Sequence, residues 1–293
     1  MLNRRALVTA SIGAGILGGC TLSPDEDHAG ADAPRAIPLA RPVRTAWVFS
    51  SGGPRGFVHV GVIKALSEIG LAPDLLVGAS VGSVVAVMYG CGKSARDIER
   101  MALDLKPLSL GRIAIGGNMR LSGSAISDMV RGEVNGLLLE RMRTPVVCVA
   151  ARMSDGGLMG FNAGDAGVAV QASCAIEGQF TPVRIRGERY VDADLYQPLP
   201  VRLARQLGAT RILAVDASAH EGRAPAGSER YRAGDLRKRA LTEPDARAAD
   251  LTLHPEFSYY VNLSREFREL AIAAGYRTTL AAAKQLAALY AVA

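Results

Sequence analysis

The feature of this sequence that most constrains its structure is a strand–glycine turn–helix unit that occurs twice within fifty residues. Residues 46–49 are an apolar run rich in strand formers, and they lead into the Gly-rich turn 50–56. Apolar residues then recur at near-helical spacing until Gly70, which ends the predicted helix. This order aims several backbone N–H groups at one point, at a helix N-terminus where negative charge is favoured.

Two functions compete for the first turn. A phosphate cradle is one, but the sequence has neither G-x-x-x-x-G-K-[ST] nor a complete G-x-G-x-x-G, which disfavours nucleotide binding. An oxyanion hole is the other, in which N–H donors face the negative oxygen of a tetrahedral intermediate.

The second unit decides between them. Residues 74–77 predict a strand, and an apolar helix follows from residue 83 toward residue 91. Between them stands G-x-S-x-G, with Ser80 flanked by Gly78 and Gly82. The strand–turn–helix context makes this motif credible, because the strained turn needs small flanks to project the serine hydroxyl. We therefore predict that Ser80 is a catalytic nucleophile and that the first turn is its oxyanion hole.

A nucleophilic serine needs a base, and the four histidines are candidates. His28 lies in the N-terminal segment, and His59 lies early in the first helix, where a packing or capping role is expected. Either His220 or His254 would complete a Ser-Asp-His triad in the chain order of α/β-hydrolases. Against that alternative, the oxyanion motif of those enzymes normally precedes the nucleophile by many more residues and is not G-G-x-R-G.

The two glycine motifs in this order resemble the patatin-like phospholipase family. That family's third motif is an aspartate in D-G-[GA], and Asp192 stands at the matching place here, before a run that ends at Pro200. Residues 172–180 are similar to the family's "ASxAxPxxF" segment, and residues 249–255 and 274–276 resemble its closing strand and last helix. The resemblance spans about residues 46–289.

The resemblance implies an α/β fold, a three-layer α/β/α sandwich with a mostly parallel central sheet. It implies hydrolysis of lipid acyl esters by a Ser-Asp dyad without histidine, metal or organic cofactor. Ser80 would be the nucleophile and Asp192 the base, with Gly52, Gly53 and Arg55 donating backbone N–H groups to the oxyanion. The substrate would be a membrane phospholipid or lysophospholipid.

The sequence departs from the family pattern at three positions. Ser51 replaces a glycine before the oxyanion turn, Ala193 replaces the glycine after Asp192, and Glu177 replaces a proline. Asp194 is a second candidate base, since alternation along an extended segment would put it on the same side as Asp192. These departures keep open an alternative class of function, a non-catalytic envelope lipoprotein that uses the fold to bind a lipid or a partner.

The N-terminus resembles an export signal. Arg4 and Arg5 precede an apolar run of 12 residues, which is too short to span a bilayer. Leu17-Gly18-Gly19-Cys20 resembles the lipobox of bacterial lipoproteins, which implies cleavage before Cys20 and its lipidation. We expect a signal peptide at 1–19, a flexible Pro-containing tether at 20–43 and one catalytic domain at 44–293. Thr21 rather than aspartate follows the cysteine, and in the lipoproteins that this segment resembles this implies the outer membrane of a Gram-negative cell, facing the periplasm.

Charge and cysteine content narrow the remaining classes of function. Lys and Arg number 34 against 28 Asp and Glu, but the arginines are scattered apart from one local cluster at Arg237, Lys238 and Arg239. This cluster is expected to be a solvated face or loop, so nucleic-acid binding is not expected. Four cysteines without C-x-x-C or paired histidines argue against a zinc module or a disulfide framework.

Residues 219–250 predict a surface segment, with a mobile cover over the site as the alternative. The apolar C-terminus predicts a packing helix.

Overall fold

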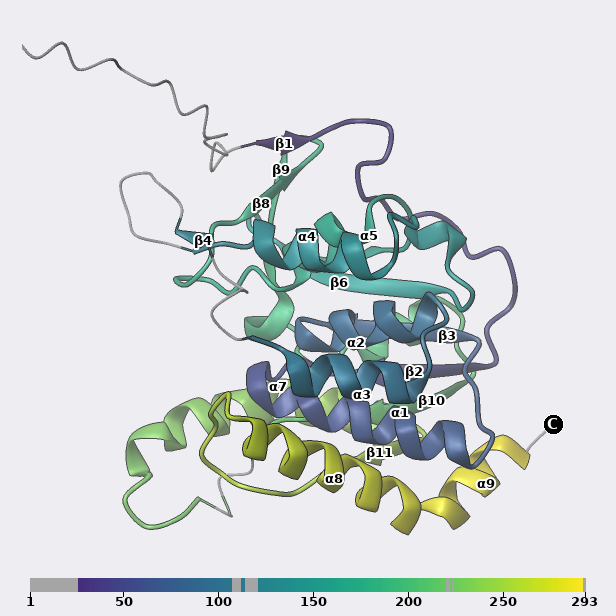
Figure 1. Cartoon of the computed structure of the whole chain (residues 1–293), viewed down its shortest axis with the longest axis vertical. Helices are drawn as coiled ribbons and strands as arrows, with labels where there is room; N and C mark the ends of the chain where they lie inside the picture. Colours follow the sequence, from purple (N-terminus) through teal and green to yellow (C-terminus); the bar gives the residue numbers. More distant parts are fainter. Residues whose placement is uncertain (1–25, 107–111, 114–120, 220–221, 223, 292–293) are drawn as a thin grey trace, which may run out of the picture.

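The computed structural model describes residues 26–106, 112–113, 121–219, 222 and 224–291 (Figure 1). The expected signal peptide, Cys20 and His220 therefore lie outside the described residues.

A nine-stranded sheet forms the centre of the described fold. Along the sheet the strands are β1 (Asp27–His28), β8 (Val183–Ile185), β9 (Glu188–Asp192), β6 (Val146–Arg152), β3 (Leu75–Ala79), β2 (Thr45–Phe49), β10 (Arg211–Val215) and β11 (Leu251–Leu253), and β7 (Leu158–Phe161) pairs with β6. The middle of the sheet is parallel, with β6, β3, β2, β10 and β11 as successive neighbours, while β7 and β9 run antiparallel to β6. A short antiparallel ribbon of β4 (Arg112–Ile113) and β5 (Leu121–Ser122) stands apart from the sheet.

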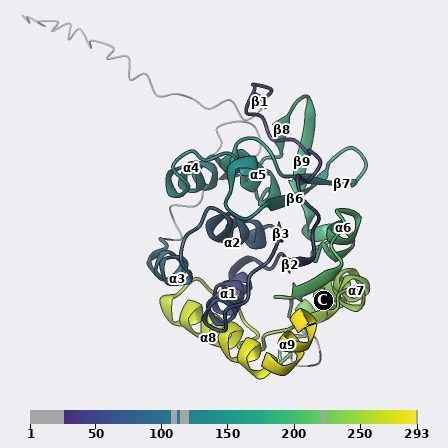
Figure 2. The same cartoon turned by 90° about the vertical axis from the view of Figure 1, so that its right-hand side faces the viewer.

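Helices cover both faces of the sheet, which confirms the predicted three-layer α/β/α arrangement. Figure 2 shows α6 (Val201–Gln206) and α7 (Arg232–Ala248) on one side of the sheet and most of the other helices opposite them, with α9 (Ala283–Ala291) at the lower edge. That larger layer consists of α1 (Val58–Glu68), α2 (Val81–Gly90), α3 (Ala95–Asp104), α4 (Ser124–Glu133), α5 (Ala166–Ser173) and α8 (Arg265–Ala281).

The central strands are apolar at nearly every position because both of their faces are buried; the polar exceptions Thr45, Arg152 and Arg211 stand at strand ends. In β2, Trp47 and Phe49 join the core under the larger helical layer, whereas Ala46 and Val48 join the core under α6 and α7. On the larger layer α1 and α8 cross closely, since a Cβ at Gly61 would stand 1.9 Å from the Ile272 carbonyl oxygen. The backbones can approach this far only at glycine, which fixes α8 beside the start of α1.

The N-terminal segment differs from the flexible tether expected at 20–43. From residue 26 onward it lies on the domain: β1 pairs with β8, and Ala33 and Val43 are buried. The Ile37 N–H donates to Asn162 Oδ1 at 2.7 Å, and Asn162 Nδ2 donates back to the Ile37 carbonyl at 2.8 Å. These reciprocal hydrogen bonds replace the hydrogen bonds that a free segment would make with water. A proline-rich composition gives no indication of them.

The C-terminal prediction agrees with the structure, since Leu286 of α9 is fully buried against the core. Residues 219–250, expected to be a surface segment, contain the 17-residue helix α7. No helix in the described part of the chain is both long and apolar enough to cross a membrane.

Candidate active site

The two glycine turns meet because β2 and β3 are parallel neighbours, with Phe49 level with Gly78. Ser80 follows β3 and precedes α2 in a strained backbone conformation, with φ 53° and ψ −127°. A Cβ at Gly78 would stand 2.4 Å from the Gly82 carbonyl carbon, and a Cβ at Gly82 would stand 2.5 Å from the Phe49 carbonyl oxygen. The turn therefore closes only with glycine at both flanks of Ser80, as the motif predicted.

The backbone of Ser80 is held by two other serines. Its N–H donates to the Ser173 hydroxyl at 2.9 Å, and that hydroxyl donates to the Val149 carbonyl at 2.6 Å. The Ser83 hydroxyl donates to the Ser80 carbonyl at 2.6 Å. Ser80 is 5% exposed, so these bonds fix its position in a nearly dry environment.

Asp192, the predicted base, ends β9 and lies beside Ser80. It is 2% exposed; its Oδ1 accepts the Asp194 N–H at 2.9 Å, and its Oδ2 has no hydrogen-bond partner among the described residues. Burial raises the pKa of Asp192 to about 7, while the Ser80 hydroxyl acts in the opposite direction and favours the ionised carboxylate. The influence of the Ser80 hydroxyl on this pKa shows that the two side chains are neighbours.

The Gly-rich turn forms the 3-10 helix η1 (Gly53–Phe57), with Gly52 preceding it. Gly53 has φ +51°, a conformation that favours glycine. The N–H groups of Gly52 and Gly53 donate no hydrogen bond to any described residue, which leaves both open to an acceptor. The third predicted donor is wrong for this structure: the Arg55 N–H donates to the Gly52 carbonyl at 3.1 Å, because a 3-10 turn closes with this bond.

Arg55 instead anchors the turn through its buried side chain. Its Nε donates to the Ala217 carbonyl at 2.9 Å, its Nη1 donates to the Ser258 carbonyl at 2.8 Å, and the guanidinium lies 4.5 Å from the ring centroid of Phe257. Burial lowers the pKa of Arg55, and nearby Asp216 acts in the opposite direction. The segments after β10 and after β11 are thereby tied to the Gly-rich turn.

The turn is also packed directly against the residue that follows Ser80. A Cβ at Gly56 would stand 2.1 Å from Val81 Cγ1. The contact sets the separation between the open N–H groups and the Ser80 hydroxyl.

Asp194 does not serve as the second base that the sequence allowed. The chain turns into the 3-10 helix η4 (Ala193–Leu195) directly after Asp192, so the expected extended alternation is wrong. Asp194 accepts the Ser51 hydroxyl at 2.5 Å and forms an ion pair with Lys238 of α7, whose Nζ also donates to Ser51 Oγ at 2.7 Å. We call Ser51, Asp194 and Lys238 the lysine cluster.

The departures from the family pattern are accommodated without backbone strain. Neither Ser51 nor Ala193 has a positive φ, so neither position requires glycine here. Glu177 lies at the surface, where its Oε1 accepts the Tyr196 hydroxyl at 2.7 Å.

The described histidines form no hydrogen bond with Ser80. His59 is fully buried in α1 with Nε2 2.9 Å from the Ser50 carbonyl, and burial lowers its pKa to about 4. His254 Nε2 lies 3.0 Å from the Ser218 carbonyl. Within the described ranges, no group of three or more His, Cys, Asp or Glu side chains is arranged to hold a metal ion.

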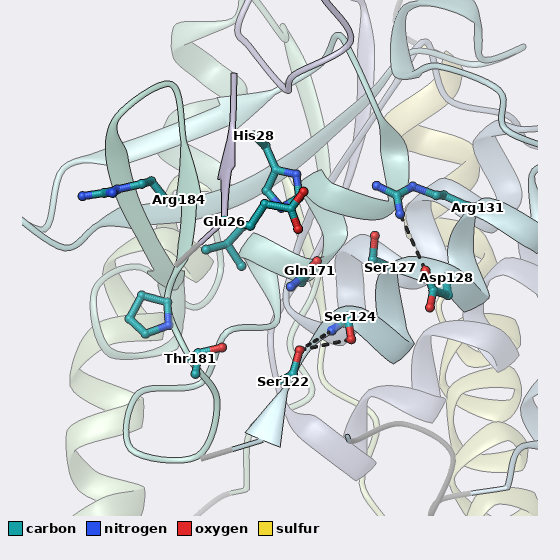
Figure 3. A pocket seen from close by; sticks show the side chains of 12 residues that line it. Glu26, His28, Ser122, Ser124, Ser127, Asp128, Arg131, Gln171, Thr181 and Arg184 are labelled. Carbon is teal, nitrogen blue, oxygen red and sulfur yellow. Dashed lines mark hydrogen bonds and ion pairs between the residues drawn. The ribbon is translucent and has the colours of Figure 1, made fainter. Parts of the chain in front are cut away.

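A cavity of about 270 Å³ lies elsewhere, between β1, α4 and the segment before β8 (Figure 3). His28, Ser127 and Arg184 are among the side chains around it, whereas Ser80 and Asp192 are not. His28 therefore belongs to this cavity and not to the serine site.

Together the fold and this geometry define a class: an α/β protein with a serine on a strained turn, a buried carboxylate and a Gly-rich loop with open N–H groups. Residues 47–205 match the patatin-like phospholipase family, and the chain belongs to that family. The resemblance read from the sequence is confirmed to this extent.

Curated relatives carry the same assignment. An uncharacterized NTE family protein of Mycobacterium tuberculosis is 30% identical over 61% of this chain and 50% of its own length. The patatin-like phospholipase domain-containing protein 6 of Mus musculus is 26% identical over 60% of this chain and 14% of its own length. The chain thus spans half or less of the length of these relatives.

Among solved structures, VipD from Legionella pneumophila matches with a TM-score of 0.57 at 12% identity, covering 89% of this chain and 71% of that one. This likeness concerns the fold.

Sequence reasoning missed two groups that support the site. Ser173 lies within the segment that resembles "ASxAxPxxF", and that resemblance was the only signal for it. Lys238 belongs to the basic cluster that was expected to be solvated, but it forms an ion pair with Asp194.

Proposed function

We propose that this protein is a lipid acyl hydrolase of the phospholipase A or lysophospholipase type, acting through a Ser80–Asp192 dyad. The observation that carries the proposal is the buried carboxylate of Asp192 beside a serine on a strained turn. A carboxylate with a pKa near neutrality is well matched to general-base work at neutral pH.

The chemistry follows from these positions. Asp192 takes the proton of the Ser80 hydroxyl while Ser80 Oγ attacks the carbonyl carbon of the ester, and the carbonyl oxygen becomes an oxyanion. The open N–H groups of Gly52 and Gly53 are available to stabilise that charge. The proton on Asp192 passes to the departing alcohol, which leaves an acyl ester on Ser80. Water, deprotonated by Asp192, then releases the fatty acid and restores both groups.

Family membership supports the class of substrate, an acyl ester of a membrane phospholipid or lysophospholipid. The proposed route uses only side chains and backbone N–H groups of this chain, so no metal or organic cofactor takes part.

The proposal is tested with a fluorophosphonate probe, which labels activated serine nucleophiles. Wild type and Ser154→Ala, a control at an exposed serine, should both be labelled, and Ser80→Ala should not. Mass spectrometry of phospholipid vesicles after incubation should show free fatty acid and lysolipid with wild type and Ser154→Ala, and neither product with Ser80→Ala. Labelling that survives in Ser80→Ala would place the nucleophile elsewhere. A wild-type protein that folds but neither labels nor hydrolyses lipid would favour the non-catalytic binding module.

We also propose that the protein is lipid-anchored through Cys20, in the outer membrane and facing the periplasm. The lipobox-like Leu17-Gly18-Gly19-Cys20 and the following Thr21 support this location. Cys20→Ser should stay unprocessed or fail to partition into detergent phase. A mass and membrane fraction identical to wild type in Cys20→Ser would contradict lipidation.

A further inference from the structure

Exposed aromatic and aliphatic side chains gather where the start of α7 meets the segment before α8. The ring centroids of Tyr231, Tyr259 and Tyr260 lie 5.3 to 6.4 Å from one another. Tyr231, Tyr260, Val261 and Leu263 are 40 to 49% exposed. We call these five residues the tyrosine patch. Exposing a contiguous group of large apolar side chains to water is unfavourable, so a patch of this kind marks a binding surface.

Basic residues border the tyrosine patch. Residues 229–239 contain five Lys or Arg and two Asp or Glu. The Arg230 guanidinium lies 4.6 Å from the ring centroid of Tyr231, and the Tyr259 hydroxyl donates to Asp235 Oδ2 at 2.5 Å. The rings are thus held in place next to a surface of net positive charge.

Tyrosine rings beside arginines suit the boundary between lipid headgroups and acyl chains. A tyrosine presents an apolar ring and a polar hydroxyl, and each Lys or Arg near an anionic bilayer adds to the attraction. The charge complementarity therefore favours an anionic lipid surface as the occupant of this patch.

The patch is connected to the candidate active site by two contacts. Arg55 of the Gly-rich turn donates to the carbonyl of Ser258, which immediately precedes the patch. Lys238, two turns along α7 from Tyr231, reaches Ser51 and Asp194 in the lysine cluster. In Figure 1 the start of α7, the segment before α8 and the start of α1 lie together on the left of the view.

Resting on the proposed lipid hydrolysis, we infer that the tyrosine patch docks this protein on anionic bilayers and brings the Gly-rich turn to the lipid surface. The patch supplies the apolar contact, and the arginines at the start of α7 supply the preference for negative charge. Docking at this place brings a membrane lipid to the site that Arg55 and Lys238 contact.

The test is flotation with phosphatidylcholine vesicles, with and without phosphatidylglycerol. All proteins carry Ser80→Ala, so that vesicles stay intact, and start at Thr21, so that neither the apolar N-terminal run nor a lipid on Cys20 contributes to binding. Tyr260→Ser/Val261→Ser is compared with Ile69→Ser/Leu280→Ser, whose two side chains are each 39% exposed but lie elsewhere.

Binding to the mixed vesicles should fall about tenfold or more in the patch variant, because two half-exposed side chains lose their apolar contact with lipid. The control variant should bind like the parent. Arg230→Gln/Arg232→Gln should weaken binding to the mixed vesicles and flatten its salt dependence, with little change on phosphatidylcholine alone.

Hydrolysis of a water-soluble ester separates this inference from the proposed function. With Ser80 present, the patch variant should keep soluble-ester hydrolysis near wild type and lose vesicle hydrolysis. If the wild-type protein does not hydrolyse the soluble ester, the proposed function is refuted, but the flotation result remains valid. Equal flotation of patch and control variants would overturn the docking inference. So would a dimer in sedimentation that the patch variant abolishes, since the patch would then be an interface between two copies.

Discussion

Asp192→Asn is expected to stabilise the folded protein at neutral and alkaline pH while removing its activity. Burial raises the pKa of Asp192 from 3.8 to about 7, so the folded protein binds a proton that the unfolded chain has released. Because the unfolded state binds fewer protons in this range, stability falls as the pH rises from about 4 to about 7 and stays low above it. The difference between the pKa values of the folded and unfolded states lowers the free energy of unfolding of wild type by about 4 kcal/mol at pH 8.

Asparagine removes this penalty and preserves the shape of the side chain. Its amide oxygen accepts the Asp194 N–H as Oδ1 of Asp192 does. The gain in the free energy of unfolding of Asp192→Asn over wild type should therefore grow from near zero at about pH 4 to about 4 kcal/mol at about pH 8.

Urea unfolding followed by tryptophan fluorescence measures this difference, since Trp47 is the single tryptophan and is fully buried. Asp104→Asn, at a carboxylate 63% exposed, is the control and should show little pH-dependent gain. A gain for Asp192→Asn that does not depend on pH, or a less stable variant at pH 8, would refute the reasoning.

Three further substitutions test the surroundings of the site. Lys238 lowers the pKa of Asp192, so Lys238→Met should move the acid limb of kcat/KM to higher pH, and a shift to lower pH would contradict this. Gly56→Ala puts a Cβ where Val81 Cγ1 lies at 2.1 Å; activity should drop about tenfold or more and stability by about 1–3 kcal/mol, and unchanged kinetics would show that the spacing is not critical. Ser173→Ala leaves the buried Ser80 N–H without its acceptor and should cost about 1–3 kcal/mol in urea unfolding, whereas a neutral result would indicate a replacement partner.

Local patterns were enough to predict the elements that present the site. The strands β2 and β3 and the helices α1 and α2 lie where apolar runs and glycine turns placed them. These signals are short-range, because strand, turn and helix follow each other directly in the chain. The glycines that flank Ser80 were predictable for the same reason, since steric closure of the turn is a local requirement.

Contacts between distant segments were not predictable from this single sequence. Ser173 reaches Ser80 across 93 positions and Lys238 reaches Ser51 across 187, and no local pattern encodes either approach. The helix α7 was missed because it buries little apolar surface and contains Pro244. The donor assigned to Arg55 failed because the 3-10 turn uses that N–H, which depends on backbone geometry and not on residue type.

The comparison of Asp192→Asn, Ser80→Ala, His220→Ala and His254→Ala in ester hydrolysis tests the central claim most directly. In a dyad, the carboxylate itself accepts the serine proton, so Asp192→Asn should lose about 10³-fold or more in kcat/KM, as should Ser80→Ala. Each histidine variant should stay within about tenfold of wild type. A collapse of activity in a folded His220→Ala or His254→Ala protein, with Asp192→Asn near normal, would contradict the dyad and restore a Ser-His-Asp triad.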